Sequence, residues 1–157
     1  MIYETETVKG KLFEDKTFSF PIRIYYEDTD AGGIVYYANY LRYAERARTE
    51  YLRHLGINQQ EMLKSQGMGF VVRDCHISYK SPAKLDDALN ITCKVTELKG
   101  VSLKMEQKLY RGENVICEIE ITLVFLSLPA MRPTKIPAEI SACCQLRSKK
   151  LPIFSDF

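Results

Sequence analysis

Hydrophobic and polar residues alternate along much of this chain, and one segment replaces the alternation with a longer period. From residue 18, five side chains share one face of an extended segment: Phe18, Phe20, Ile22, Ile24 and Tyr26. Pro21 lies inside this run, and proline within a sheet is confined to strand starts, edges and bulges. The pattern therefore predicts an edge strand over residues 18–26.

Residues 38–55 change to the period of an α-helix. One apolar stripe runs along the segment, and charged residues occupy its other side; the stripe contains Tyr40, Ala44, Ala47, Tyr51 and Leu55. Asn39 is a candidate N-cap and Gly56 a candidate residue just past the C-terminus. The small Ala44 and Ala47 predict that the helix lies close against another layer. A shorter helical segment is expected over residues 58–66.

The remaining pattern predicts four strands joined by turns, over residues 70–79, 88–98, 101–109 and 115–128. Lys99-Gly100 is a tight hairpin signal, and a second turn follows at residues 111–114. The last strand is polar in its first half and apolar in its second, which indicates a central strand covered on both faces over part of its length. Three prolines then end the regular structure: Pro129, Pro133 and Pro137.

This order of elements predicts an α+β fold, in which a five-stranded antiparallel sheet wraps around one long helix. Because one helix covers only one sheet face, we expect the other face to need cover and the chain to self-associate. The expected organisation is a flexible N-terminal arm over residues 1–16, one folded domain over 17–137, and a loosely held C-terminal tail over 138–157 with Lys149 and Lys150.

Composition narrows the functional classes. A chain of 157 residues and 18.1 kDa suits a single domain. The net charge of +2 is small and the basic residues are dispersed, which argues against nucleic acid as a partner. The chain contains no apolar run long enough to span a membrane, and its N-terminus is polar, so a cytoplasmic protein is expected. Two histidines and five cysteines without metal-ligand spacing predict no metal site and structural cysteines.

The stretch EDTDAGG, residues 27–33, allows two interpretations. It can be an acidic turn that stabilises the N-terminus of the following helix. Alternatively, Asp30 stands beside free helix N–H groups, and a carboxylate with such donors is the pair that hydrolysis at a carbonyl requires. Gly32 and Gly33 would let the backbone take unusual angles there, and the apolar residues 34–37 would wall a pocket.

Residues 22–53, IRIYYEDTDAGGIVYYANYLRYAERARTEYLR, resemble the signature region of hotdog-fold thioesterases. More narrowly, they resemble the 4-hydroxybenzoyl-CoA thioesterase class and its bacterial acyl-CoA thioesterase branch associated with the Tol–Pal system. Later pieces match more loosely but in the right order: YKSPAKLDD, ELKGVSL and EIEITLVFLSLPAMRP. The resemblance implies a hotdog domain over residues 17–137, whose active sites lie at the interface of a homodimer or homotetramer.

The resemblance also implies roles for individual residues. Asp30 matches the catalytic carboxylate, acting as general base or nucleophile, and the backbone N–H of Tyr37 matches the group facing the thioester oxygen. Lys99 matches a basic position used for the phosphates of coenzyme A. Gly33, Val35 and Tyr36 are the other expected substrate-binding residues. The Tol–Pal branch usually has His where this chain has Tyr37, so the resemblance leaves the acyl group open.

Two helix glutamates are alternative catalytic candidates, since some hotdog thioesterases use one. Glu45 and Glu50 have arginines at pairing distance along the helix, which favours ion pairs on the surface. The expected reaction is hydrolysis of an acyl-CoA or an acyl carrier protein thioester to free acid and thiol, with no cofactor. The alternative is a non-catalytic hotdog-fold protein that binds an acyl group or acts as a scaffold. Asp30 favours the enzyme, because a pure binder gains nothing from a desolvated carboxylate.

Overall fold

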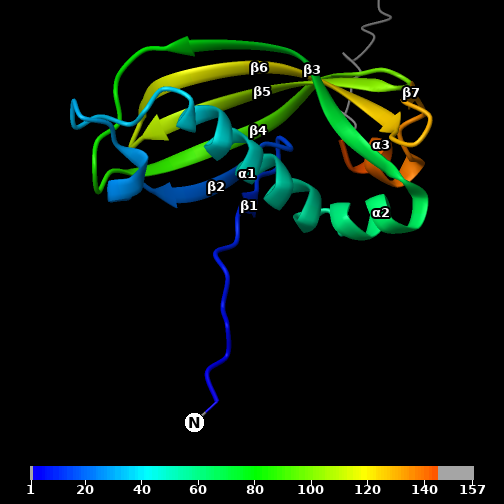
Figure 1. Cartoon of the computed structure of the whole chain (residues 1–157), viewed down its shortest axis with the longest axis horizontal. Coiled ribbons are helices and arrows are strands. Elements are labelled where there is room, and N and C mark those ends of the chain that lie inside the picture. The colour runs from blue at the N-terminus through cyan, green and yellow to red at the C-terminus, as the bar shows by residue number, and fades with distance from the viewer. Residues whose placement is uncertain (1, 145–157) are drawn as a thin grey trace, which may run out of the picture.

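The fold is a curled antiparallel sheet with a long helix across its concave face, seen in a computed structural model that describes residues 2–144 (Figure 1). The strands follow the order β1-β2-β4-β5-β6-β3, and β7 pairs with β6. Their bounds are β1 Lys11–Leu12, β2 Phe18–Arg23, β3 Met68–Tyr79, β4 Ala88–Leu98, β5 Ser102–Arg111, β6 Asn114–Ser127 and β7 Arg132–Pro133. The helices are α1 Asn39–His54, α2 Gln59–Gln66 and α3 Ala138–Cys144, with a short 3-10 helix η1 at Tyr26–Asp28.

The predicted strands and hairpins are present, together with two short strands that were not predicted. The expected sheet of five strands contains seven strand segments, because β1 and β7 add two residues each. The Lys99-Gly100 hairpin forms, and the N–H of Lys99 donates to the Ser102 carbonyl at 2.8 Å. Strand β6 lies between β5 and β3, and its second half is buried from residue 121 to residue 126. That burial confirms the prediction of a central strand.

The first strand is shorter than predicted. Strand β2 ends at Arg23, and the chain then turns into η1, so Tyr26 is 82% exposed and does not share a buried face with Phe18. Pro21 pairs with Asn90 of β4 and lies beyond the two residues that pair with β1. The edge position that its missing N–H requires is therefore available.

Helix α1 lies close to the sheet, as its small residues predicted. Ala44 and Ala47 are fully buried. Gln107 of β5 is also fully buried, and its Nε2 donates to the Ala44 carbonyl at 2.9 Å. The Oε1 atom of Gln107 accepts from Arg48 at 2.8 Å. This glutamine thus satisfies polar groups of the helix at its closest approach to the sheet.

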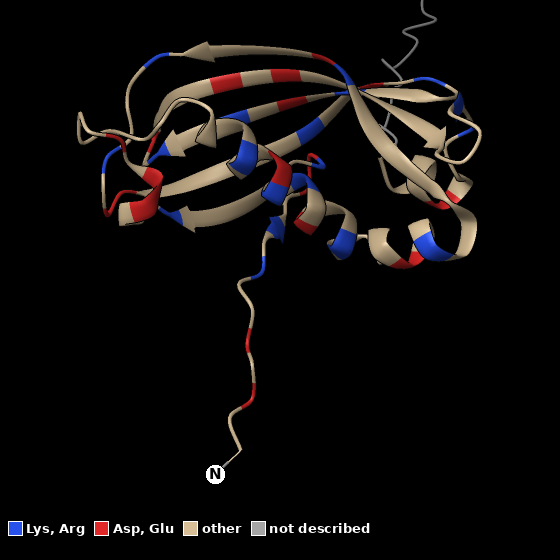
Figure 2. Cartoon of the chain, in the orientation of Figure 1, with Lys and Arg blue, Asp and Glu red and all other residues tan. Residues whose placement is uncertain are grey.

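The convex face of the sheet is polar, contrary to the expectation that it needs cover. Charged residues alternate along β4, β5 and β6 (Figure 2), and cross-strand neighbours include Lys94 with Glu106 and Lys108 with Glu118. Such exposed charges are solvated and each pair contributes little stability. The convex face therefore gives no reason for self-association. Strand β3 gives a different one, because it is an edge strand of twelve residues.

The two ends of the chain are more ordered than the pattern indicated. Lys11–Leu12 pair with β2 inside the expected arm, and residues 2–10 form no helix or strand. The first residues of the expected tail form α3 directly after Pro137, with Ile140 and Cys144 buried. The rest of that tail, with Lys149 and Lys150, lies outside the described residues. Within residues 2–144, no helix combines the length and hydropathy that crossing a bilayer requires.

Candidate active site

The Asp30 loop is a tight turn between η1 and α1. The N–H of Asp30 donates to the Ile34 carbonyl at 2.9 Å, and the N–H of Gly33 donates back to the Asp30 carbonyl at 3.0 Å. Gly33 has a φ of 77°, a left-handed conformation that glycine adopts without steric cost. The exposed Asp30 carboxylate accepts from the Gly32 N–H through Oδ1 at 2.8 Å. Its Oδ2 has no hydrogen-bond or ion-pair partner among residues 2–144.

Asp28 anchors this loop to the helix. It is 8% exposed, and its Oδ2 accepts from the Tyr25 N–H at 2.7 Å. Its carbonyl accepts from the Tyr36 N–H and from Asn39 Nδ2, each at 3.0 Å. Asn39 was expected to cap α1, but it is the first helical residue and its side chain holds Asp28 instead. This anchor was not predictable from the sequence, because a buried aspartate and an exposed one look alike in an acidic run.

A second segment, residues 79–84, holds the loop from the other side. The Val35 N–H donates to the Ala83 carbonyl at 2.9 Å, and the Ala83 N–H donates to the Tyr40 hydroxyl at 3.0 Å. The Tyr79 hydroxyl donates to the Tyr37 carbonyl at 3.0 Å. These contacts fix the backbone between Asp30 and α1 from a part of the chain more than forty residues away.

The backbone N–H of Tyr37 is the second group that the sequence predicted for the site. It donates to no acceptor within the described part of the chain, and it lies just before the N-terminus of α1. A helix N-terminus attracts negative charge, so a developing oxyanion is stabilised there. Asp30 and this N–H belong to one hydrogen-bonded loop, so that loop contains both groups that the sequence predicted for the site.

The other predicted site residues divide into three positions. Tyr36 and Tyr37 are 47% and 63% exposed and their rings lie 5.0 Å apart, so they form an open aromatic surface beside the loop. Val35 is 3% exposed and belongs to the hydrophobic core, where its side chain supports the loop from beneath. Lys99 lies at the far end of β4 and pairs with Glu97 at 3.1 Å. Eleven residues of β4 at about 3.3 Å each put Lys99 about 35 Å from the Asp30 end of the sheet.

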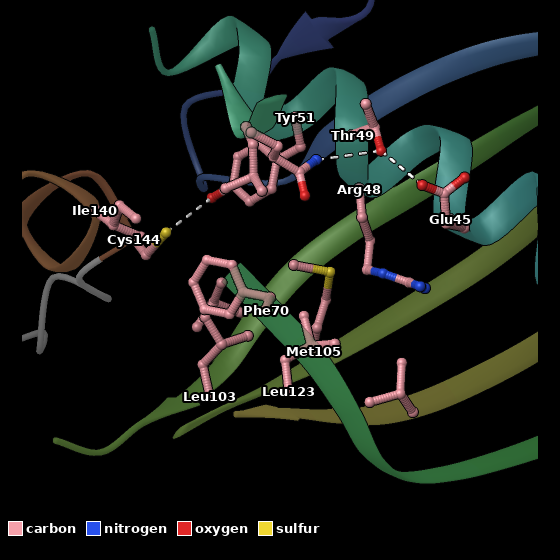
Figure 3. A pocket seen from close by; sticks show the side chains of 14 residues that line it. Glu45, Arg48, Thr49, Tyr51, Phe70, Leu103, Met105, Leu123, Ile140 and Cys144 are labelled. Carbon is pink, nitrogen blue, oxygen red and sulfur yellow. Dashed lines mark hydrogen bonds between the residues drawn. The ribbon is translucent and has the colours of Figure 1, made fainter. Parts of the chain in front are cut away.

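A cavity of about 190 Å³ lies between α1, the concave face of the sheet and α3 (Figure 3). Its buried walls include Leu103, Met105 and Leu123, and the half-buried Phe70 completes them. Exposed Val72 of β3 and exposed Glu45 of α1 mark its opening beside the free edge of the sheet. The sequence did not predict this cavity, because its walls come from seven separate elements.

Polar side chains gather at the opening of the cavity. Thr49 Oγ1 donates to Glu45 Oε1 at 2.8 Å, and Gln59 Nε2 donates to Thr49 Oγ1 at 3.3 Å. The expected ion pairs of Glu45 are absent among the described residues, although Glu50 pairs with Arg53 at 3.8 Å. Burial lowers the pKa of Arg48, whose guanidinium binds Gln107. Glu45 is therefore a carboxylate oriented by Thr49 at the mouth of the cavity. The sequence had instead indicated a surface residue paired with an arginine.

No group of three potential metal-ligating side chains occurs in residues 2–144. Asp30, Asp28 and Glu45 each bond to a different protein group, as described above.

Comparison with known proteins gives consistent matches. The family model described as "Thioesterase-like superfamily" matches residues 25–143. The acyl-CoA thioesterase YbgC of Haemophilus influenzae is 46% identical over 128 residues, covering 82% of this chain and 94% of that protein. A probable thioesterase from Bartonella henselae is 32% identical with a TM-score of 0.72, covering 76% of this chain and 98% of that one.

A more distant structure shares the fold. A 4-hydroxybenzoyl CoA thioesterase variant in complex with 4-hydroxybenzoyl CoA has a TM-score of 0.77 at 22% identity, covering 82% of this chain and 99% of that one. The sheet curled around α1 is thus the hotdog fold of thioesterases. Since the family model spans the Asp30 loop, α1 and the whole sheet from β3 to β7, this chain belongs to the thioesterase-like superfamily.

Proposed function

We propose that this protein hydrolyses acyl-CoA thioesters, with Asp30 and the Tyr37 N–H as its catalytic groups. The observation that carries the proposal is the loop in which a carboxylate with an unpartnered oxygen and a free N–H at a helix start are held together. The relatives named acyl-CoA thioesterase support the reaction class. An acyl carrier protein thioester is the alternative donor, since it presents the same reacting bond.

In the proposed reaction, water attacks the thioester carbonyl while Asp30 accepts its proton. The carbonyl oxygen becomes an oxyanion, and the Tyr37 N–H and the α1 dipole stabilise it. Collapse of the tetrahedral intermediate breaks the carbon–sulfur bond, and Asp30 returns the proton to the leaving sulfur. The products are a free carboxylic acid and the thiol of coenzyme A. Asp30 can instead attack the carbonyl directly, in which case water hydrolyses the resulting anhydride.

We place the complete site at the interface of a dimer. Strand β3 has a free edge, and two such strands pair antiparallel about a two-fold axis with the start of one beside the end of the other. Tyr79 at the end of β3 bonds to Tyr37, and Phe70 near its start lines the cavity. This pairing therefore brings the Asp30 loop of one subunit next to the cavity mouth of its partner. Lys99 lies at the end of the sheet that is nearest the cavity. In the dimer it would bind the phosphates of a coenzyme A ester whose thioester lies at the Asp30 loop of the partner subunit.

Two alternatives remain to be separated by experiment. A non-catalytic acyl-binding protein would use the same cavity without turnover. A mechanism centred on Glu45 is favoured by the hydrogen-bonded chain from Gln59 through Thr49 to that carboxylate. The cytoplasmic location expected from the sequence suits coenzyme A esters as substrates and stays a prediction.

The decisive experiment measures thiol release from a panel of acyl-CoAs by Asp30→Asn and Glu45→Gln proteins. Asparagine keeps the size of Asp30 and its bond to Gly32, so the loop should persist while the proton acceptor is lost. Activity should fall by at least about a hundredfold, the usual contribution of a general base. Glu45→Gln should retain most of the activity. The reverse result would move catalysis to Glu45, and a wild-type protein that binds acyl-CoA without releasing thiol would establish the binding function instead.

A further inference from the structure

Helix α3 forms the inner end of the cavity, away from its opening. Figure 3 shows Ile140 and Cys144 at one end, with Glu45 and Arg48 of α1 at the other. Ile140 is 2% exposed and Cys144 is 3% exposed, so both side chains point into the interior. From this arrangement we infer that Ile140 and Cys144 set the upper length limit of the acyl group. The inference rests on the proposed thioester hydrolysis and adds a substrate class to it.

The polarity of the cavity gives the bound acyl group a direction. Glu45, Thr49 and Gln59 lie at the opening, where a thioester and its attacking water belong. The inner half is lined mainly by aliphatic and aromatic side chains, and its polar groups, the Tyr51 hydroxyl and the Cys144 thiol, face each other. An acyl chain consequently enters with its thioester at the mouth and its tail toward α3.

The inner end accepts an uncharged terminus. Burial raises the pKa of Tyr51 and the pKa of Cys144, so the phenol and the thiol that face each other there both stay neutral. The Tyr51 hydroxyl lies 3.7 Å from Cys144 Sγ, a weak hydrogen bond that ties α3 to α1. The tail of the substrate is therefore an uncharged alkyl or aryl group, without a terminal carboxylate.

The volume limits the size of this group. An engineered protein cavity of roughly 150 Å³ holds one benzene molecule, and this cavity measures about 190 Å³. It accommodates one aromatic ring or an alkyl tail of about six carbons. Helix α3 is held at both ends. Ile136, just before it, is 1% exposed and its N–H donates to the Gly100 carbonyl at 2.9 Å, and Cys144 at its last position contacts the Tyr51 hydroxyl. The wall is thus a fixed part of the domain.

The test compares kcat/KM for straight-chain acyl-CoAs from butanoyl to dodecanoyl in wild type and three α3 variants. Each buried methylene contributes about fourfold, equivalent to about 0.8 kcal/mol, so the wild-type values should rise to hexanoyl and then fall. Ile140→Ala should raise the decanoyl-to-hexanoyl ratio by about sixteenfold, the gain from two accommodated methylenes. Cys144→Met fills the inner end and should move the optimum to butanoyl. Cys143→Ala is the matched control, because Cys143 is on the same helix but does not line the cavity.

The outcomes separate this inference from the function on which it rests. If wild type hydrolyses acyl-CoAs and all variants keep one length profile, α3 is no length limit, while the proposed function stands. A wild-type optimum at dodecanoyl overturns the size class. If wild type hydrolyses no acyl-CoA of the panel, the proposed function is wrong, and the inference that rests on it is overturned with it. The affinities of Asp30→Asn protein for hexanoyl-CoA and for dodecanoyl-CoA measure the length preference without turnover. If Ile140→Ala does not fold, comparison of Cys144→Met with Cys143→Ala still tests whether α3 limits the acyl length.

Discussion

Two aspartates only two residues apart have opposite surroundings. Asp28 is buried, and its carboxylate accepts a backbone N–H. Asp30 is exposed, and one of its oxygens has no partner among residues 2–144. A carboxylate whose bonds are used within the protein serves structure, whereas one with a free oxygen can accept a proton from water. Burial and bonding, which the sequence does not display, thus separate an anchor from a catalytic candidate.

The anchor can be tested at Asn39, whose amide holds the Asp28 carbonyl. Asn39→Ala removes that bond and should lower the free energy of unfolding by about 1 kcal/mol. Because the Asp30 loop then shifts against α1, kcat should also fall, by about tenfold or more. Asn58→Ala is the control: Asn58 caps α2 through the Glu61 N–H at 3.1 Å, and its loss also costs about 1 kcal/mol.

Urea unfolding and steady-state kinetics on both variants check this prediction. Equal losses of stability with a loss of kcat only in Asn39→Ala would support a positioning role for Asn39. If both variants keep the wild-type kcat, the hydrogen bond to Asp28 has no part in holding the catalytic loop.

At the scale of elements, alternation and turn chemistry predicted most of the fold. The hairpin at Lys99 and the buried second half of β6 follow from local patterns, since side chains alternate across a strand and glycine favours tight turns. The end of β2 at Arg23 was not predictable, because it depends on how η1 packs. Helix α3 was missed although Pro137 stands just before it, a position that proline favours at helix starts.

The candidate site was predictable only where its residues are close in sequence. Asp30 and Tyr37 belong to one run, and the family resemblance placed them together. Tyr79 and Ala83, which hold that run, come from a distant segment, and the cavity walls come from seven elements. Contacts of this kind follow from the three-dimensional curl of the sheet and leave no local pattern.

Gly67 offers a test of how two elements are joined, since it is the single residue between α2 and β3. Its φ of 64° is left-handed, and an added Cβ would lie 3.0 Å from the Pro129 ring. Gly67→Ala should therefore lower the free energy of unfolding by about 2–4 kcal/mol, combining backbone strain with a steric contact. Gly56, with a φ of 86° and nothing near its Cβ position, is the matched control and should cost about 1 kcal/mol. Equal losses in urea unfolding would mean that the Pro129 ring moves aside freely.

For the whole molecule, the division of the site between two ends of the sheet is the main argument for a dimer. Asp30 and Lys99 lie near opposite ends of β4 in one chain. We therefore expect one substrate to meet Asp30 of one subunit and Lys99 of the partner subunit. Antiparallel pairing of β3 strands allows this, because each Asp30 loop then faces the Lys99 end of the partner. The charged convex face stays in solvent, which fits its composition.

Cys75 lies near the middle of β3 and is exposed, so in such a pairing it lies near the two-fold axis. Cys75→Asp would place a charge close to its own copy, and like charges opposite each other destabilise paired strands. We expect wild type and Cys75→Ser to be dimers of about twice 18.1 kDa by light scattering, and Cys75→Asp to dissociate at micromolar concentration. Under the shared-site proposal, activity should be lost together with the dimer in Cys75→Asp and kept in Cys75→Ser. A wild-type monomer that hydrolyses acyl-CoA at full rate would contradict both the β3 pairing and the shared site, and Asp30 would then act with groups of its own chain alone.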